Sequence, residues 1–239
     1  MKRGASSETS DGALKTQRGV VKWVYKSIVA LLVEAALLMI SVGRWNWFRG
    51  WLLVGLYAAA TVVQFLVMPP DLLAERSGIG KGAKTWDIAL GGLAASILPM
   101  TTWVVAGLDA RDGWSPPIAS ALWWFGLLLF VLGWCIALWA MHVNCYFSTL
   151  VRLQEERGQR VVTEGPYRQV RHPGYVGAIL FQLATPVILG SWWAMIPSGL
   201  AAALYVVRTA LEDETLHQEL AGYKAYAREV RYRLVPGVW

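Results

Sequence analysis

Six long runs of apolar residues alternate with polar segments along this 239-residue chain. They cover residues 28–42, 47–68, 88–108, 119–141, 175–189 and 193–211. A helix needs about 20 consecutive apolar residues to cross a bilayer, so the first and fifth runs are the shortest candidates. The pattern predicts an all-α, polytopic membrane protein with about six transmembrane helices.

Composition supports this class, because 56% of the residues are hydrophobic and the mean hydropathy is +0.41. These values are too high for an ordinary soluble domain of this length. Eight of the 14 tryptophans cluster near the expected span ends, as in an interfacial belt, and we interpret them as anchors. They are Trp45, Trp47, Trp51, Trp114, Trp123, Trp124, Trp192 and Trp193.

The basic residues predict a topology. All of the 22 Lys and Arg residues except Arg44, Arg49 and Arg111 fall in the N-terminal arm, the second and fourth connections or the C-terminal tail. The positive-inside rule therefore places both termini and the segment around His172 in the cytoplasm. There the net charge of +6 would face anionic lipid rather than nucleic acid.

Three regions follow from the pattern. Residues 1–21 are polar and predicted to be a disordered cytoplasmic arm, and residues 22–141 hold four spans. Residues 142–239 contain a long polar connection, a two-helix hairpin and a charged stretch at 211–230 with amphipathic helical spacing. No repeat of 20–50 residues is evident, which argues against an inverted-repeat transporter.

The densest chemical signal is the segment 165–175, Gly-Pro-Tyr-Arg-Gln-Val-Arg-His-Pro-Gly-Tyr. Pro173 predicts a helix start with His172 near the N-cap, where backbone amides favour an anion such as a cofactor carboxylate. Gly174 would let a ligand approach the backbone, and Tyr167 and Tyr175 offer aromatic faces to a cation. The alternative, equally open on these residues alone, is that the basic side chains contact lipid headgroups.

A second signal is Arg208 with Glu212, whose four-residue spacing puts both on one helix face. A solvated pair contributes only about 0.3–0.5 kcal/mol, so the pair would matter most if a ligand excluded water from it. Asp213 and Glu214 fall on other faces and are interpreted as solvated charges.

Three other features of the sequence are weaker evidence for a functional site. The glycine loop 78–82 resembles a nucleotide-binding loop but lacks a preceding strand, so a flexible connection is the better interpretation. Glu34 lies within the first span and is either functional or a snorkelling or hydrogen-bonded structural group. The two cysteines, Cys135 and Cys145, and three scattered histidines support neither a disulfide framework nor a zinc site.

An ordered set of motifs in residues 142–239 resembles the isoprenylcysteine carboxyl methyltransferase family of membrane enzymes. The set consists of residues 161–167, Val-Val-Thr-Glu-Gly-Pro-Tyr; residues 171–177, Arg-His-Pro-Gly-Tyr-Val-Gly; Arg208 with Glu212-Asp213; and Tyr223, Tyr226 and Val230. The resemblance implies S-adenosyl-L-methionine as methyl donor, bound without a Rossmann domain. Its pocket would lie between the cytoplasmic loop and the last two spans.

The resemblance also implies roles for individual residues. Arg208 would hold the substrate carboxylate and is the expected catalytic residue. The residues expected to line the cofactor site are Gln159, Arg160, Val161, Val162, Tyr167, His172, Pro173, Gly174, Tyr175 and Glu212. The chain has Glu212-Asp213 where relatives tend to have a Glu pair, and Arg152 at a position that contacts the cofactor in them, which leaves the role of Arg152 open.

The expected function is therefore carboxyl O-methylation of an isoprenylcysteine-like, lipophilic carboxylate taken from the bilayer. The nearest alternative is N-methylation of a phospholipid or small amine, which needs a base such as His172 or Glu212 because a protonated ammonium cannot attack. A small membrane transporter or a non-catalytic scaffold is the alternative from another class.

Overall fold

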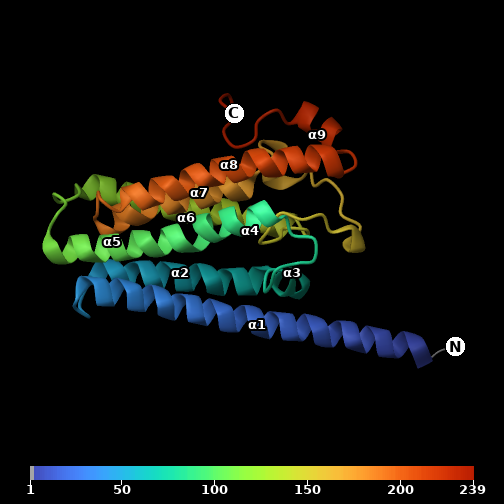
Figure 1. Cartoon of the computed structure of the whole chain (residues 1–239), viewed down its shortest axis with the longest axis horizontal. Coiled ribbons are helices and arrows are strands. Elements are labelled where there is room, and N and C mark those ends of the chain that lie inside the picture. Colours follow the sequence, from blue (N-terminus) through green and yellow to red (C-terminus); the bar gives the residue numbers. More distant parts are fainter. Residues whose placement is uncertain (1–2) are drawn as a thin grey trace.

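A computed structural model describes residues 3–239, with side chains from residue 12 onward. The long helices run side by side as a bundle (Figure 1): α1 Arg3–Val42, α2 Phe48–Val67, α4 Thr85–Gly92 continuing into α5 Leu98–Asp112, α6 Ser120–Val143, α7 Pro173–Leu189 and α8 Met195–Glu219. The π-helical segment η1 Leu93–Ile97 joins α4 to α5. Short helices are α3 Pro70–Glu75, η2 Glu155–Arg157, η3 Gly165–Arg168 and α9 Tyr223–Glu229.

The bundle has the character of a polytopic membrane protein, as predicted. Among the residues that the structure describes, four helical segments are long and apolar enough to cross a membrane: Gly12–Val42, Phe48–Val67, Thr85–Asp112 and Ser120–Val143. Helix α7 is apolar but has 17 residues, and α8 begins apolar and ends in charged turns. Each expected apolar run thus overlaps one long helix.

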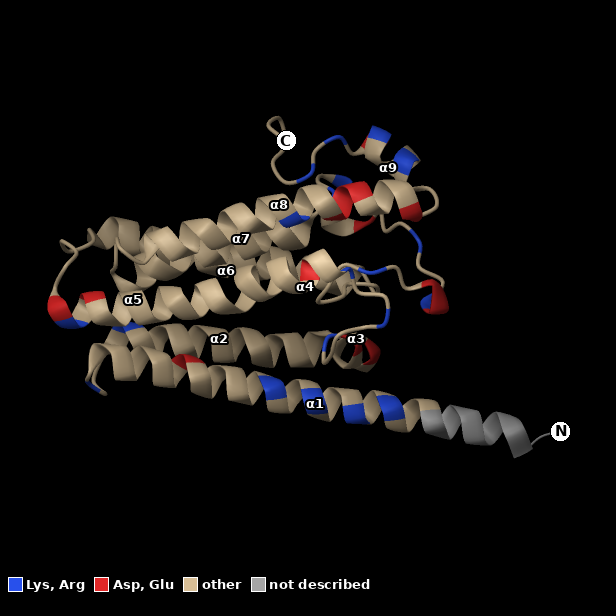
Figure 2. Ribbon diagram, in the orientation of Figure 1, with Lys and Arg blue, Asp and Glu red and all other residues tan. Residues whose placement is uncertain are grey.

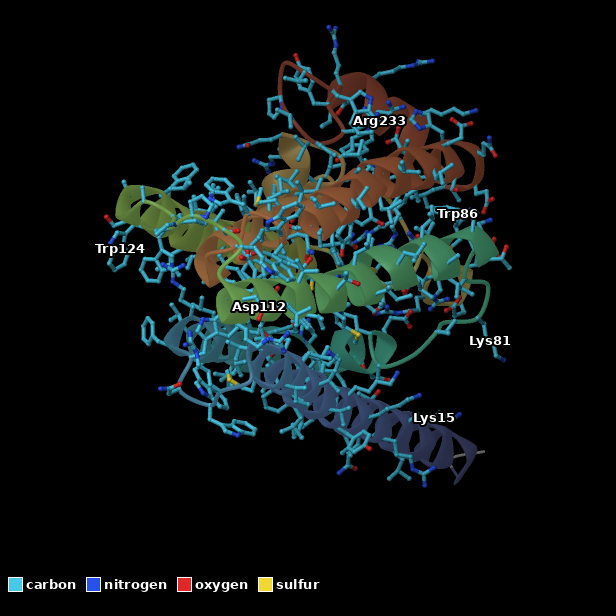
Figure 3. All side chains as sticks on the ribbon, turned by 60° about the vertical axis from the view of Figure 1, so that its left-hand side comes forward. Lys15, Lys81, Trp86, Asp112, Trp124 and Arg233 are labelled. Carbon is cyan, nitrogen blue, oxygen red and sulfur yellow. The ribbon has the colours of Figure 1, made fainter. Side chains whose placement is uncertain are left out.

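The two ends of the bundle differ in charge and in aromatic content. Lys and Arg gather near the end that holds the N-terminus, α3 and α9 (Figure 2). The expected tryptophan anchors lie mostly in the connections at the other end, where Trp45, Trp114 and Trp193 are exposed and Trp124 lies far from Lys81 (Figure 3). Trp47 is an exception, because it is buried in the core.

The predicted disordered arm is helical instead, because α1 continues through residues 12–21. Its first described turns pack on α3: the Thr16 hydroxyl donates to Asp71 at 2.9 Å, and a Cβ on Gly19 would lie 2.5 Å from that of Ala74. This tertiary contact overrides the low intrinsic preference of a polar, glycine-containing stretch for helix. Residues 1–2 lie outside the described part of the chain.

Helices α6 and α7 approach each other closely through glycine. A Cβ on Gly177 would lie 2.4 Å from the carbonyl oxygen of Gly133, and one on Gly133 would lie 2.7 Å from that of Gly177. Small residues let helix backbones pack at short range in membranes. This contact fixes the start of α7, which carries the His172 segment, against α6.

The charged stretch 211–230 is not one helix. Helix α8 runs to Glu219, and the chain then turns through Gly222, whose φ of +83° is a left-handed conformation that glycine adopts without strain. The short helix α9 follows from Tyr223. The turn folds α9 back toward the beginning of α7 and completes the wall of a cavity.

Candidate active site

A cavity of about 270 Å³ lies at the end of the bundle that carries α9. Its walls come from the ends of α6 and α8, the beginning of α7, the connection between α6 and α7, and α9, together with residues of α2, η1 and the α3–α4 connection. Every residue expected at the site lines it except Pro173: Gln159, Arg160, Val161, Val162, Tyr167, His172, Gly174, Tyr175, Arg208 and Glu212. The sequence motifs, up to 53 positions apart, thus converge on one space.

The helix start at Pro173 is confirmed. His172 is the N-cap residue of α7 and Pro173 opens the helix, while the carbonyl of His172 accepts hydrogen bonds from the amides of Tyr175 and Val176. The Tyr175 ring stacks on the His172 ring, with centroids 6.0 Å apart. The proline therefore sets the direction in which both rings meet the cavity.

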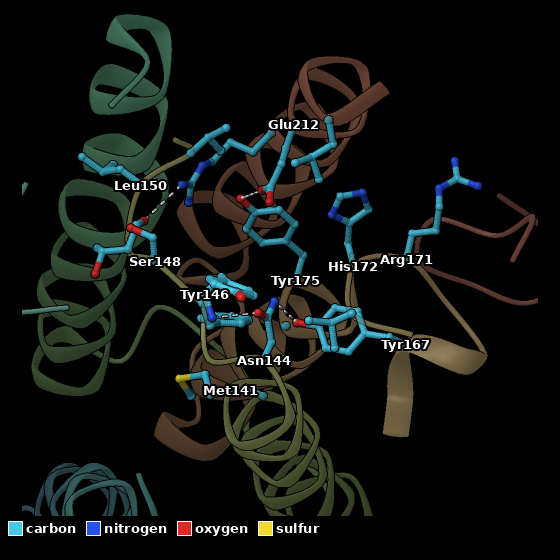
Figure 4. A pocket seen from close by; sticks show the side chains of 18 of the residues that line it. Met141, Asn144, Tyr146, Ser148, Leu150, Tyr167, Arg171, His172, Tyr175 and Glu212 are labelled. Carbon is cyan, nitrogen blue, oxygen red and sulfur yellow. Dashed lines mark hydrogen bonds between the residues drawn. The ribbon is translucent and has the colours of Figure 1, made fainter. Parts of the chain in front are cut away.

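Tyr175 and Glu212 form the polar pair at the centre of the cavity. The Tyr175 hydroxyl donates to Glu212 Oε2 at 2.6 Å, and both side chains are drawn together in Figure 4. Glu212 comes from α8 and Tyr175 from the first turn of α7. The two residues are therefore in contact, as expected, and the Glu212 carboxylate lies at the hydroxyl of an aromatic ring.

Asp213 is the largest departure from the sequence prediction at this site, because it is completely buried rather than solvated. Its Oδ1 accepts hydrogen bonds from Arg171 Nε at 2.7 Å and the Tyr223 hydroxyl at 2.8 Å, and lies 3.1 Å from His172 Nε2. Its Oδ2 accepts from Arg171 Nη2 at 2.9 Å and Arg233 Nε at 2.8 Å. Asp213 therefore joins the start of α7, α9 and the C-terminal tail.

The direction of the pKa shift of Asp213 agrees with this geometry. Burial alone would raise the pKa of Asp213, but the hydrogen bonds from His172, Arg171 and Arg233 hold its pKa well below its usual range. Glu214, the next residue, is exposed and accepts a hydrogen bond from Gln218, as a solvated charge would. The two neighbours differ because successive helical residues point about 100° apart.

The headgroup interpretation of Arg171 is wrong. Its side chain is buried, it points away from Tyr175 (Figure 4), and its Nη1 donates to the carbonyls of Val230 and Arg231. The backbone amide of Arg171 also donates to the carbonyl of Tyr232 at 2.9 Å. The C-terminal tail is thus hydrogen-bonded to the segment that precedes α7. Arg168, by contrast, is exposed.

Arg208 has a different partner from the one expected. Its Nε donates to Asp87 Oδ1 at 2.6 Å and its Nη2 to Asp87 Oδ2 at 2.8 Å, so the pair is bidentate and fully buried. Asp87 Oδ2 also accepts the amide of Val151 at 2.7 Å. The guanidinium lies over the Tyr175 ring at 5.3 Å. Sequence analysis missed Asp87, which the chain marks only as an acidic residue at the beginning of an apolar run.

A cluster of apolar and aromatic residues forms the wall near α9. Tyr167, Tyr223 and Tyr226 are buried together, with Val161 and Val162 packed against them. The Tyr226 hydroxyl donates to the carbonyl of Tyr167 at 2.7 Å. This wall can take a flat, largely apolar group.

The polar residues of the connection between α6 and α7 differ in their hydrogen bonds and exposure. Asn144 Nδ2 donates to the Tyr167 hydroxyl at 3.1 Å. Gln159 Oε1 accepts the backbone amide of Gln154 at 2.7 Å, so this side chain holds the loop together, whereas Arg160 is exposed at the cavity edge.

The open space expected beside Gly174 is filled by protein. A Cβ on Gly174 would lie 2.5 Å from the ring of Phe147, which itself lines the cavity. Glycine is required here because an aromatic side chain packs on the backbone of α7. A ligand would meet Phe147 rather than the Gly174 backbone.

Arg152 serves as a clamp between two connections. Its Nε donates to Glu75 Oε1 at 2.9 Å and its Nη1 to Glu156 Oε1 at 2.8 Å. A Cβ on Gly80 would lie 2.3 Å from Arg152 Nε, so the glycine loop packs against this guanidinium.

Glu34 is buried in α1 and does not line the cavity; its Oε1 has no hydrogen-bond partner in the described part of the chain.

Residues 122–221 match the sequence model of the phospholipid methyltransferase family. Curated relatives include protein-S-isoprenylcysteine O-methyltransferase of Dictyostelium discoideum, 31% identical over 121 residues, which are 49% of this chain and 51% of the relative. Protein-S-isoprenylcysteine O-methyltransferase B of Arabidopsis thaliana is 34% identical over 71 residues, 28% and 36% of the two chains.

An uncharacterized protein of Bacillus subtilis, YpbQ, is 29% identical over 99 residues, 40% of this chain and 58% of the relative. The chain spans about half the length of the Dictyostelium relative and about a third of the Arabidopsis one. These matches confirm the resemblance to the isoprenylcysteine carboxyl methyltransferase family for the C-terminal region. The long helices before α6 contribute no part of the family match, although Gln64 and Ala95 of the cavity lining precede it, as does Asp87, which pairs with Arg208.

Proposed function

From the membership of residues 122–221 in this family of membrane methyltransferases, we propose that the chain transfers a methyl group from S-adenosyl-L-methionine to the carboxylate of an isoprenylcysteine-like lipid. The observation that carries the proposal is the single cavity in which Tyr175, Glu212 and Arg208 meet beside an apolar wall. The lining combines charged and hydroxyl groups with apolar side chains such as Ala137, Ala178 and Phe181.

The residues present fit the proposed cofactor. When bound, S-adenosyl-L-methionine supplies an electrophilic methyl group on a cationic sulfonium. The Tyr175 ring offers a face to such a cation, a contact worth about 0.5–2 kcal/mol, and Glu212 beside it adds a negative charge. The apolar wall of Val161, Val162 and Tyr167 suits an adenine ring.

Arg208 would hold the acceptor carboxylate through its remaining donor. Asp87 takes Nε and Nη2, and no hydrogen bond within residues 12–239 uses Nη1. The bidentate pair fixes the plane of the guanidinium, so Nη1 is presented in one direction. A carboxylate is ionised at neutral pH and needs no general base. The residues would then act by orientation, which can supply about 7–11 kcal/mol of a barrier.

The charges of the cavity favour an anionic acceptor over an amine. Five arginines line it; Arg152, Arg171 and Arg208 are paired with carboxylates outside the lining, which leaves Arg76 and Arg160 against the one lining carboxylate, Glu212. The arginines are Arg76, Arg152, Arg160, Arg171 and Arg208. An ammonium acceptor would be repelled by this excess of positive charge. N-methylation would also need Glu212 or His172 as a base, and Glu212 already accepts a hydrogen bond from Tyr175. A transporter or scaffold has no use for the converging motifs.

The same charges suggest the orientation in the membrane. The cavity lies at the end of the bundle where Lys and Arg gather (Figure 2), and the positive-inside rule assigns that end to the cytoplasm. Both termini and the site would then face the cytoplasm. The acceptor would enter with its hydrocarbon in the bilayer and its carboxylate at the inner surface.

Separating cofactor binding from transfer tests the proposal. Glu212→Gln should weaken binding of S-adenosylhomocysteine, measured by calorimetry on the purified protein. Arg208→Gln would leave Asp87 as a buried, unpaired charge, so the double variant Asp87→Asn/Arg208→Gln, which removes both charges, is the better folded test. The double variant should bind S-adenosylhomocysteine with normal affinity and lose methyl transfer to a prenylcysteine acid. Normal turnover by the double variant would contradict the role of Arg208.

A further inference from the structure

Arg76 is a cation in the cavity that no carboxylate of residues 12–239 neutralises. It lies just after α3, lines the cavity, and its Nε is completely enclosed without a hydrogen-bond partner. The guanidinium lies 5.3 Å from the centre of the Phe147 ring. No hydrogen bond or ion pair of its side chain is found within residues 12–239.

The other arginines that line the cavity are accounted for. Arg152 is paired with Glu75 and Glu156, Arg171 with Asp213, and Arg208 with Asp87. Arg160 is exposed to solvent at the edge. Among the arginines of the cavity that lie away from its exposed edge, Arg76 alone therefore brings a positive charge that the described part of the chain does not balance.

This arrangement costs the folded protein free energy. Burial lowers the pKa of the Arg76 guanidinium to about 10, which reflects the penalty of holding the charged form away from water. Removing an unpaired buried charge is expected to be neutral or stabilising, because no partner is left behind. A position that weakens the fold in this way is best explained by a ligand that supplies the missing negative charge.

We propose that Arg76 binds the carboxylate of the acceptor, together with Arg208. Thr149 contacts both residues: its carbonyl accepts a hydrogen bond from Arg208 Nη2 at 3.5 Å and its hydroxyl donates to the carbonyl of Arg76 at 3.4 Å, so the two arginines line the same part of the cavity. The Arg208–Asp87 pair is neutral as a whole, and Arg76 supplies the net positive charge that a buried carboxylate needs. This inference rests on the proposed function for the identity of the acceptor.

The position of Arg76 separates this carboxylate from that of the cofactor. Arg76 follows α3, whose Leu72 and Leu73 are buried with Met141 and Ala137 in a cluster distinct from the Tyr167–Tyr226 wall. Phe147 packs against both clusters and lies between Arg76 and the start of α7. The Arg76 guanidinium thus belongs to the side of the cavity built by the N-terminal helices.

The test compares two ligands of equal size, N-acetyl-S-farnesylcysteine and its uncharged carboxamide. Their binding to the purified full-length protein is measured by calorimetry, with S-adenosylhomocysteine present so that no transfer occurs. Wild type should prefer the acid at least tenfold, which corresponds to about 1.4 kcal/mol. Arg76→Gln should lose this preference and keep normal affinity for S-adenosylhomocysteine, whereas Arg76→Lys should keep part of the preference. Arg168→Gln is the matched control and should behave as wild type, because Arg168 is exposed and does not line the cavity.

A second readout excludes a purely structural role. Without ligand, Arg76→Gln should unfold at a temperature equal to or above that of wild type, whereas Arg152→Gln should unfold earlier because it leaves Glu75 unpaired. Three results would overturn the inference: Arg76→Gln keeps the preference for the acid, wild type shows no such preference, or Arg76→Gln unfolds at a lower temperature than wild type. Weaker binding of S-adenosylhomocysteine by Arg76→Gln would also overturn it, since the carboxylate held would be that of the cofactor. Because binding is measured without turnover, these outcomes stay distinct from a failure to methylate.

Discussion

Arg208 and Asp87 are 121 residues apart in sequence and form a bidentate, fully buried ion pair. The pair connects α8, within the family match, to α4, which precedes it. The orientation of a candidate catalytic arginine therefore depends on a helix that carries no family motif. Asp87 also accepts the amide of Val151, so it positions the cavity loop at the same time.

This relationship predicts that Asp87→Asn impairs both stability and transfer. Loss of one partner leaves the Arg208 charge buried without compensation, at a cost of about 3–5 kcal/mol. The thermal unfolding midpoint in detergent should fall, and the KM for a prenylcysteine acid should rise. Asp71→Asn is the matched control, because Asp71 is exposed and accepts one hydrogen bond from Thr16. Equal midpoints for the two variants would contradict a special role of Asp87.

Asp213 predicts a particular dependence of stability on pH. Its folded pKa lies below the ordinary value of about 3.9, so its contribution is present above that value and is lost as pH falls through the folded pKa. The unfolding midpoint of the wild type should therefore be constant between pH 7 and 5 and should fall steeply below pH 4. Asp213→Asn should be less stable at pH 7, and its midpoint should depend less on acid pH.

Glu214→Gln provides the comparison, since that carboxylate is exposed. If Asp213→Asn and Glu214→Gln give the same pH profile, the Asp213 hydrogen bonds do not stabilise the fold as described.

Tyr175 and Glu212 predict separable effects on cofactor affinity. Tyr175→Phe keeps the aromatic face and removes the hydroxyl bonded to Glu212, so affinity for S-adenosyl-L-methionine should change little. Tyr175→Leu removes the face and should weaken binding by about 2- to 30-fold, as expected for a cation–π contact of about 0.5–2 kcal/mol. The comparison uses S-adenosylhomocysteine, which lacks the sulfonium charge and should be affected less. Equal losses for both ligands would exclude a cation–π contact.

The glycine contact between α6 and α7 predicts a packing defect. Gly177→Ala brings a methyl group to within 2.4 Å of the Gly133 carbonyl oxygen, and the helices must separate at a cost of roughly 1–3 kcal/mol. The unfolding midpoint and transfer should both fall, because Tyr175 lies only two residues before Gly177 in the same helix. Gly199→Ala is the control: nothing lies within 4 Å of its added Cβ, so its stability should be equal or higher.

The helices could be predicted because they depend on local pattern, whereas the convergence of the motifs was expected from the family resemblance. Apolar runs located the long helices, and Pro173 located the start of α7. The partners of the site residues depend on long-range packing and could not be predicted in this way. Asp213 was expected in solvent because helical spacing does not show that α9 and the tail fold over it.

The helical arm at residues 12–21 shows the same limit of local composition. Its preference for disorder is overridden by α3, a six-residue helix that the apolar pattern does not mark. Gly174 is another case: glycine was correctly singled out, but its partner is Phe147 from a distant connection rather than a ligand. In each case the residue was visible in the sequence and its contact was not.

The most direct test of the proposed function is the chemistry of the product. Purified protein is incubated with S-adenosyl-L-methionine carrying a labelled methyl group and either N-acetyl-S-farnesylcysteine or a phosphatidylethanolamine, and the lipid product is treated with mild alkali. Label should transfer to the prenylcysteine acid and be released as volatile methanol, since a methyl ester is hydrolysed by base. Label that transfers only to the phospholipid amine and resists alkali would contradict the proposed function.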